Sequence, residues 1–78
     1  MEDQRVERLL AQLFKIPLAA ISDELSMSDV EAWDSLQHME LILSVEQTFQ
    51  IQLAFDDIVA MQSVGQIKQV LRQKGVIR

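Results

Sequence analysis

The segment from Trp33 to Phe49 contains neither Gly nor Pro and has apolar residues at helical spacing. Near its start, Asp34 is followed three residues later by Gln37, a spacing that satisfies the unpaired N–H groups of a helix start. The pattern predicts a helix that begins at Ser35. Because a helix of this length must bury one face in so small a protein, the other segments are expected to pack around it.

This predicted helix has two apolar stripes on different sides. On a helical wheel of about 100° per residue, the stripe expected to face the core consists of Leu41, Ile42, Val45 and Phe49. The second, called the docking stripe below, consists of Leu36, Met39 and Leu43. Because the docking stripe lies well over about 90° from the first, it cannot face the same core and is expected to bind a partner. Ser35 lies at its rim, at a helix N-terminus that would favour an attached phosphate.

At these residues the chain resembles acyl carrier proteins. The resemblance rests on Asp34-Ser35-Leu36 at the helix start, Met39-Glu40-Leu41 after it, and Glu46 and Phe49 near its end. The tripeptide alone indicates no more than a helix cap, but the helix pattern, the chain length and the charge layout agree with it. The resemblance implies that Ser35 carries 4′-phosphopantetheine through a phosphodiester, and that the thiol of this arm holds the cargo as a thioester.

The same resemblance implies a surface for partner enzymes. These are a phosphopantetheinyl transferase and the enzymes that load and transfer the acyl group, all with basic docking surfaces. The expected docking residues are Leu36, Met39, Glu40 and Leu43, with Asp34, Glu46, Asp56 and Asp57 as supporting charges. Gln37 and Gln47 occupy positions where many carriers have acidic residues. The negative electrostatic potential of this surface is therefore expected to be weaker than in those carriers.

Acidic and basic residues are separated along the chain. The formal net charge is -5, and no Lys or Arg lies between Ile16 and Ile67. All seven basic residues lie toward the two ends. A central acidic surface repels the phosphates of nucleic acid and attracts a basic protein surface, so we expect protein partners and no nucleic acid.

The chain of 78 residues has room for one small domain, and residues 1–78 are expected to form a single carrier domain. It has no Cys and one His, which disfavours a disulfide framework or a metal centre. A thioester carrier of this composition must obtain its thiol from a prosthetic group. The N-terminus lacks the apolar region of a secretory signal, and no apolar run reaches membrane-spanning length. We therefore expect a cytoplasmic monomer that does not insert into membranes.

Three further helices are predicted. The first extends from Asp3 to Phe14, with Val6, Leu9, Leu10 and Leu13 on its apolar face, and ends by about Lys15 because Pro17 disfavours helical geometry at Ile16. The short third helix covers Phe55 to Met61, where Asp56 and Asp57 suit the helix dipole. The last begins at a cap formed by Ser63 and Gln66, ends before Gly75, and buries Val64, Ile67, Val70 and Leu71.

The connections are less regular. The long loop from Leu18 to Trp33 is expected to be anchored by Ile21 and Leu25, and the spacing of Ser28 and Glu31 suggests a short helical turn within it. Carrier proteins have a long loop at this place, so the resemblance makes it expected. The segment from Gln50 to Ala54 is expected to be a connection, because no second strand is available for it.

Two side chains beside Ser35 have distinctive chemistry. Trp33 is expected to pack its ring between the loop and the helices rather than to bind cargo. His38 has no group to pair it with a nucleophile, so it is expected to be a partly buried polar residue near the mouth of the bundle. By resemblance, that position can line the space where a carrier shelters its acyl chain.

The predicted fold is therefore all-α: a small four-helix bundle of three longer helices, with a short one packed between the second and the fourth. The predicted function is that of an acyl carrier protein of fatty acid or polyketide biosynthesis, which is not itself an enzyme. An aminoacyl or peptidyl carrier is an alternative, disfavoured because Ala32-Trp33 replaces the small residues that commonly precede the serine there. A second alternative is a helical interaction module in which Ser35 only caps a helix.

Overall fold

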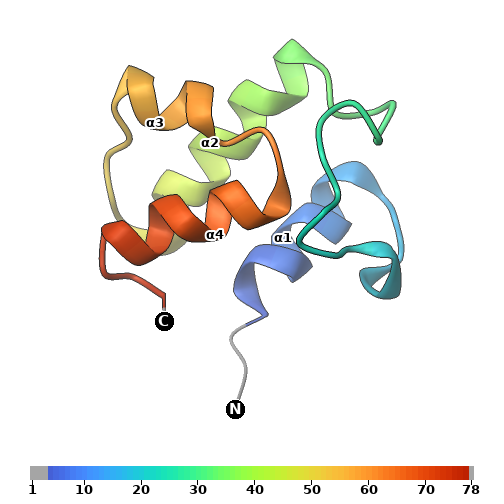
Figure 1. The fold of residues 1–78 in the computed structure, drawn as a ribbon, viewed down its shortest axis with the longest axis horizontal. Coiled ribbons are helices and arrows are strands. Elements are labelled where there is room, and N and C mark those ends of the chain that lie inside the picture. Colours follow the sequence, from blue (N-terminus) through green and yellow to red (C-terminus); the bar gives the residue numbers. More distant parts are fainter. Residues whose placement is uncertain (1–3, 78) are drawn as a thin grey trace.

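The computed structural model describes residues 4–77, and within them the fold is all-α, as predicted (Figure 1). The helices are α1 (Arg5–Phe14), α2 (Ser35–Phe49), the short α3 (Phe55–Ala60) and α4 (Val64–Gln73). A single 3₁₀ turn, η1 (Leu18–Ala20), follows α1 and was not predicted. No strand occurs in residues 4–77, so the segment before α3 is a connection. The expected start of the first helix at Asp3 lies outside the described residues.

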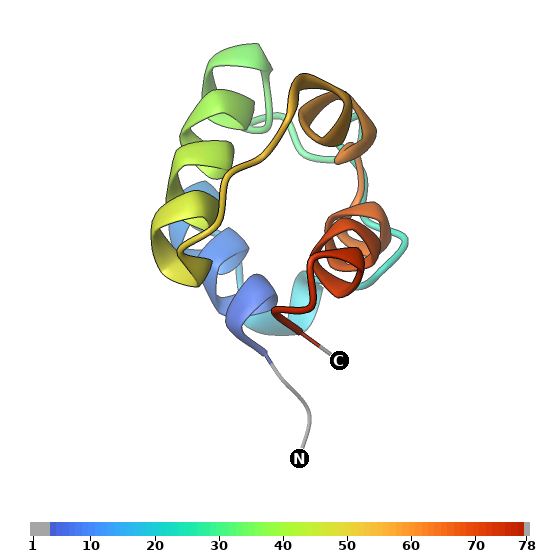
Figure 2. The ribbon, with the colours of Figure 1, turned by 90° about the vertical axis from the view of Figure 1, so that its left-hand side faces the viewer.

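The core lies between α1, α2 and α4, with α3 at one end of the bundle (Figure 2). The four residues predicted for the core face of α2 and the four predicted for α4 are all buried. In α1 the predicted apolar face is confirmed, because Val6 and Leu10 are buried and Leu9 and Leu13 are partly buried against the core. The buried face of α1 is Val6, Leu10 and Phe14. These residues are spaced by four, so Leu9 and Leu13 lie at the edge of that face, where they line a surface pocket.

Side chains and backbone conformation fix where the helices begin and end. The backbone N–H of Gln37 donates to Asp34 Oδ1 (2.9 Å), so α2 begins at Ser35, as predicted. The backbone N–H of Gln66 donates to Ser63 Oγ (3.2 Å) at the start of α4. Gly75 follows α4 with φ +77°, a conformation that glycine adopts without strain.

The long loop between α1 and α2 is fixed to the start of α4. Ile21 and Leu25 pack against the core, as predicted. Val64 N–H donates to the carbonyl of Leu25, and Gly65 N–H to that of Asp23, both at 2.9 Å. A Cβ at Gly65 would lie 3.1 Å from the Asp23 carbonyl oxygen, so this close approach favours glycine.

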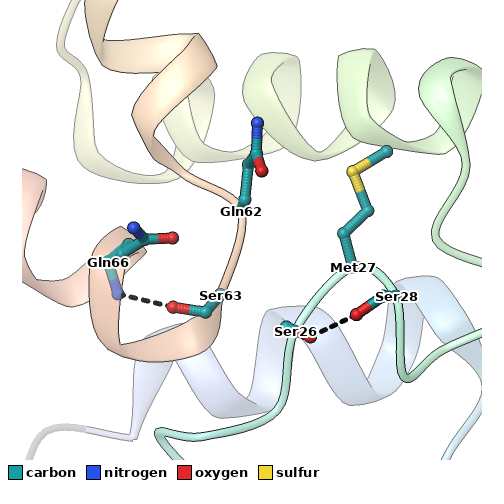
Figure 3. Close-up of a pocket in the computed structure, with 6 residues that line it drawn as sticks. All are labelled: Ser26, Met27, Ser28, Gln62, Ser63 and Gln66. Atoms are coloured by element: carbon teal, nitrogen blue, oxygen red, sulfur yellow. Dashed lines mark hydrogen bonds between the residues drawn. The ribbon is translucent and has the colours of Figure 1, made fainter.

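The loop also meets the link between α3 and α4. Met27 N–H donates to the Gln62 carbonyl (2.9 Å), and Ser26 pairs with Ser63 in an isolated bridge. A shallow pocket of about 420 Å³ lies on this seam (Figure 3). Its lining consists of Ser26, Met27, Ser28, Gln62, Ser63 and Gln66.

No helix forms where the spacing of Ser28 and Glu31 suggested a short helical turn, and the loop makes two hydrogen-bonded turns there. The loop instead turns at Ser26, whose N–H donates to Asp29 Oδ2 (3.0 Å), while Asp29 N–H donates to the Ser26 carbonyl (2.9 Å). A second turn follows, in which Trp33 N–H donates to the Val30 carbonyl (3.0 Å).

An ion-pair cluster joins α1, the loop and α4. Lys68 Nζ contacts Glu7 Oε2 and lies 2.7 Å from Asp23 Oδ1, and the side chains of Lys68 and Glu7 are largely buried. Burial by itself lowers the pKa of Lys68, but the hydrogen bonds to Asp23 and Glu7 outweigh it and raise this pKa above its ordinary value. Lys68 is therefore charged throughout the physiological range.

A second ion pair predicts an acid-dependent effect of Lys74→Gln. Lys74 Nζ lies 3.0 Å from Asp57 Oδ2, which also accepts from Ala54 N–H (3.0 Å). The hydrogen bond from Lys74 is the main cause of the lowered pKa of Asp57. A pKa that is lower in the folded than in the unfolded protein stabilises the fold at pH values above the unfolded-state pKa, near 3.8. This contribution is lost as the pH falls through the folded-state pKa.

Lys74→Gln should therefore unfold at lower urea concentration than the wild type at pH 7, and the difference should shrink below pH 3.8. The effect should be small, because the pair lies at the surface. Lys15→Gln is the matched control, since Lys15 is exposed and forms no ion pair with residues 4–77. A difference of equal size at pH 7 and pH 3 would show that the pair does not act through the charge of Asp57.

Candidate functional site

Ser35 is the first residue of α2, and its side chain is exposed. The capping bond from Gln37 to Asp34 is made by its neighbours, and the Ser35 hydroxyl forms no hydrogen bond with another residue in 4–77. The partial positive charge of the helix N-terminus lies beside it. The hydroxyl is therefore accessible to an enzyme, in an electrostatic setting that favours an attached phosphate.

The docking stripe is exposed, as predicted. Leu36 is 71% exposed and Met39 48%, while Leu43 is about half exposed. On the opposite side of α2, Leu41 and Val45 are fully buried. The helix therefore does have two apolar sides, one of which faces solvent next to Ser35.

Two exposed apolar residues of α3 were missed by sequence reasoning. Phe55 is 77% exposed and Val59 about half exposed. They are spaced by four and so share one side of α3, away from the partly buried Ile58. Figures 1 and 2 show α3 at the same end of the molecule as the start of α2. The spacing of Phe55 and Val59 was the available signal for this surface.

The five acidic side chains predicted for docking have different surroundings. Glu40 and Asp56 are exposed and make no ion pair with the described residues. Asp34 is occupied as the cap of α2. Glu46 is partly buried, and its Oε2 accepts from Leu53 N–H (2.9 Å). Asp57 is paired with Lys74, so Glu40 and Asp56 are the acids whose charge is most available to a partner.

Trp33 and His38 form a buried pair beside Ser35. Trp33 is 2% exposed, and its ring stacks on Phe14 with centroids 5.2 Å apart, so it packs in the interior as predicted. His38 is 9% exposed and thus more buried than predicted. Its Nδ1 accepts from Trp33 Nε1 (3.0 Å), so Nε2 carries the proton and donates to the Ile58 carbonyl (2.9 Å). Because both ring nitrogens have partners, burial leaves no polar atom unpaired.

The described residues form neither a recognisable metal site nor a membrane-spanning helix. Residues 4–77 contain no group of three or more His, Asp or Glu side chains placed to hold a metal ion. None of the helices in this range combines the length and the apolarity needed to cross a membrane.

The fold and the exposed serine at a helix start describe a small helical carrier protein. The family model described as "Phosphopantetheine attachment site" matches residues 4–71, and the chain belongs to this family of phosphopantetheine-bearing carriers. Its members are carriers rather than enzymes, so the alternative of a non-carrier interaction module is wrong. Membership also implies a phosphopantetheinyl transferase and biosynthetic enzymes as partners.

A solved structure supports the same assignment. The chain is similar to the holo acyl carrier protein from Geobacter metallireducens, determined by solution NMR, with a TM-score of 0.78 and 30% sequence identity. The similarity covers 88% of this chain and 79% of the other.

Met39→Ala should leave the fold intact but slow attachment of the arm. Met39 is about half exposed, and substitutions at exposed positions usually change stability by no more than about 0.5 kcal/mol. Loss of a docking contact worth about 1 kcal/mol should slow modification by about fivefold. The measurements are thermal melting and the rate of modification by a phosphopantetheinyl transferase.

Phe49→Ala is the comparison for this prediction. Phe49 is buried in the core, and its truncation should cost about 3–5 kcal/mol of stability. A Met39→Ala protein that melts as early as Phe49→Ala would show that the two sides of α2 are wrongly assigned.

Proposed function

We propose that this protein is an acyl carrier protein in which Ser35 bears the 4′-phosphopantetheine arm. The observation that supports this best is the exposed Ser35 hydroxyl at the start of α2, next to the apolar docking stripe. The arm supplies a thiol on which a cargo is held as a thioester, a group that the chain itself lacks because it has no Cys.

The residues around Ser35 suit such a group. A phosphodiester requires an accessible hydroxyl, and this hydroxyl is not engaged by the described residues. The negative charge of the phosphate would lie at the positive end of α2. The Asp34 side chain accepts a hydrogen bond from Gln37 N–H, which fixes the helix start. The Ser35 hydroxyl is not needed for this cap and is free to react.

The proposed docking surface combines the docking stripe with Glu40 and Asp56. The transferase and the acyl-transferring enzymes would cover the apolar residues and present basic side chains to the two acids. Phe55 and Val59 extend the apolar surface onto α3. Asp34, Glu46 and Asp57 remain part of the proposal as supporting charges, although each has a partner within the protein.

An aminoacyl or peptidyl carrier is the alternative within the same family. The similarity to a holo acyl carrier protein and the Ala32-Trp33 pair before Ser35 support the acyl type.

The test is to purify the protein from its own cells under mildly acidic, non-reducing conditions, release the cargo with cysteamine and identify it by mass spectrometry. A released acyl group supports the proposal, whereas an amino acid or peptide overturns it.

A further inference from the structure

The interior beside Ser35 is closed by a chain of side-chain contacts. Trp33 lies two residues before Ser35, and His38 three residues after it, so the two rings lie on either side of the proposed attachment point in sequence. Their rings stack with centroids 6.2 Å apart. With the Phe14 ring against Trp33, a row of three rings extends from α1 to α2.

Hydrogen bonds lock this row to α3. Trp33 Nε1 donates to His38 Nδ1 (3.0 Å), and His38 Nε2 donates to the Ile58 carbonyl (2.9 Å). That carbonyl lies in the last turn of α3 and also accepts from the capping N–H of Met61 (3.3 Å), so His38 adds a second hydrogen bond at the end of α3. We call this chain of bonds from Trp33 through His38 to Ile58 the latch.

An alkyl chain carried on Ser35 that entered the core between α2 and α3 would meet the latch, which joins these two helices. Movement of the His38 ring would leave the buried Trp33 Nε1 without a partner, which is costly, and would leave the Ile58 carbonyl with only the Met61 N–H (3.3 Å). The space is already filled, since Trp33, Leu41 and Met61 are almost completely buried. The pockets on the Met27–Gln62 seam, beside Leu9 and Leu13, and beside Asp57 and Gln73 do not include Trp33, His38 or Ile58 in their linings.

We propose that the latch keeps the core closed, so that this carrier holds its cargo outside the helices and serves acyl groups too short or too polar to need burial. This inference rests on the proposed function, because it requires an acyl arm at Ser35. It assigns to Trp33 and His38 a role in selecting cargo as well as in packing.

The experiment loads the protein with acetyl-, hexanoyl- or decanoyl-phosphopantetheine, using a phosphopantetheinyl transferase and the matching acyl-coenzyme A. Intact mass confirms each product. Because Trp33 is the only Trp, its indole N–H signal in NMR spectra reports on the latch without ambiguity. Melting temperature and the position of this signal should be the same for all three acyl groups. A melting temperature that rises with chain length, together with a shifted indole signal, would overturn the inference.

His38→Ala provides the matched variant. It removes the latch and leaves space beside Trp33, so its melting temperature should rise with acyl chain length while that of the wild type does not. Identical profiles in the two proteins would show that the latch does not exclude cargo.

If His38→Ala does not fold, Trp33→Phe removes one hydrogen bond of the latch while keeping a ring in place. Failure of Ser35 to accept any acyl arm would count against the proposed function, whereas a chain-length effect in a loaded wild-type protein counts only against the latch.

Discussion

Ser35→Ala should abolish attachment of phosphopantetheine while leaving the fold intact. The substitution removes the hydroxyl that would form the phosphodiester, and the methyl group of alanine has no oxygen to which the phosphate could be attached. Stability should change by no more than about 0.5 kcal/mol, because the residue is exposed and its hydroxyl makes no hydrogen bond within residues 4–77. Intact mass after incubation with coenzyme A and a transferase should show one adduct on the wild type and none on the variant.

A second Ser→Ala variant tests whether the loss of modification is specific to Ser35 or follows from the loss of any exposed serine hydroxyl. Ser22→Ala is suited to this, since Ser22 is also exposed but lies in the loop before α2. It should be modified as fast as the wild type, with peptide mapping placing the adduct on Ser35. An adduct on Ser35→Ala, or a wild type that is never modified, would contradict the assignment of Ser35.

The helices and the exposed serine could be predicted because their signals are local. Asp34 and Gln37 set the start of α2 by a contact three residues apart, and the periodicity of a long helix separates its core side from its docking stripe. The end of α1 was also predicted, because Pro17 acts on its immediate neighbour. Each of these features depends on residues within one or two turns of each other.

Other features had a weak local signal or none. Helices α1 and α2 end in left-handed residues at Lys15 and Gln50, with φ of 57° and 55°, where glycine is the usual signal. Helix α3 has only six residues, so the spacing of Phe55 and Val59 was a weak signal that the two share an exposed side. The turn at Ser26 pairs through the backbone with the link before α4, a contact between residues far apart in the sequence.

The latch shows the same limit at the candidate site. The single His suggested a partly buried polar residue, because its two partners could not be identified from the sequence. Trp33 is close in the chain, but the Ile58 carbonyl belongs to another helix and is brought to His38 only by the tertiary fold. Burial of a polar ring depends on such partners, and for this reason the depth of His38 was underestimated.

Glu40→Lys should slow attachment of the arm by about tenfold at low salt, mainly through the association step. Glu40 is exposed beside the docking stripe, and the other acids on this side are largely engaged within the protein. Reversing its charge replaces attraction by repulsion toward a basic enzyme surface. Charge steering acts over a Debye length of about 8 Å at physiological salt, so the difference between the two proteins should fall as salt rises.

The control is Glu24→Lys, which changes the net charge equally at an exposed loop position outside the docking stripe. If overall charge governed association, the two variants would be slowed alike. If Glu40 meets a basic side chain of the transferase, only Glu40→Lys should be slowed strongly, and its rate should depend less on salt than that of the wild type. The measurement is the modification rate against salt for all three proteins, with melting curves to verify the fold. Equal rates for Glu40→Lys and the wild type at low salt would show that docking does not use this acid, and that the apolar stripe provides recognition without it.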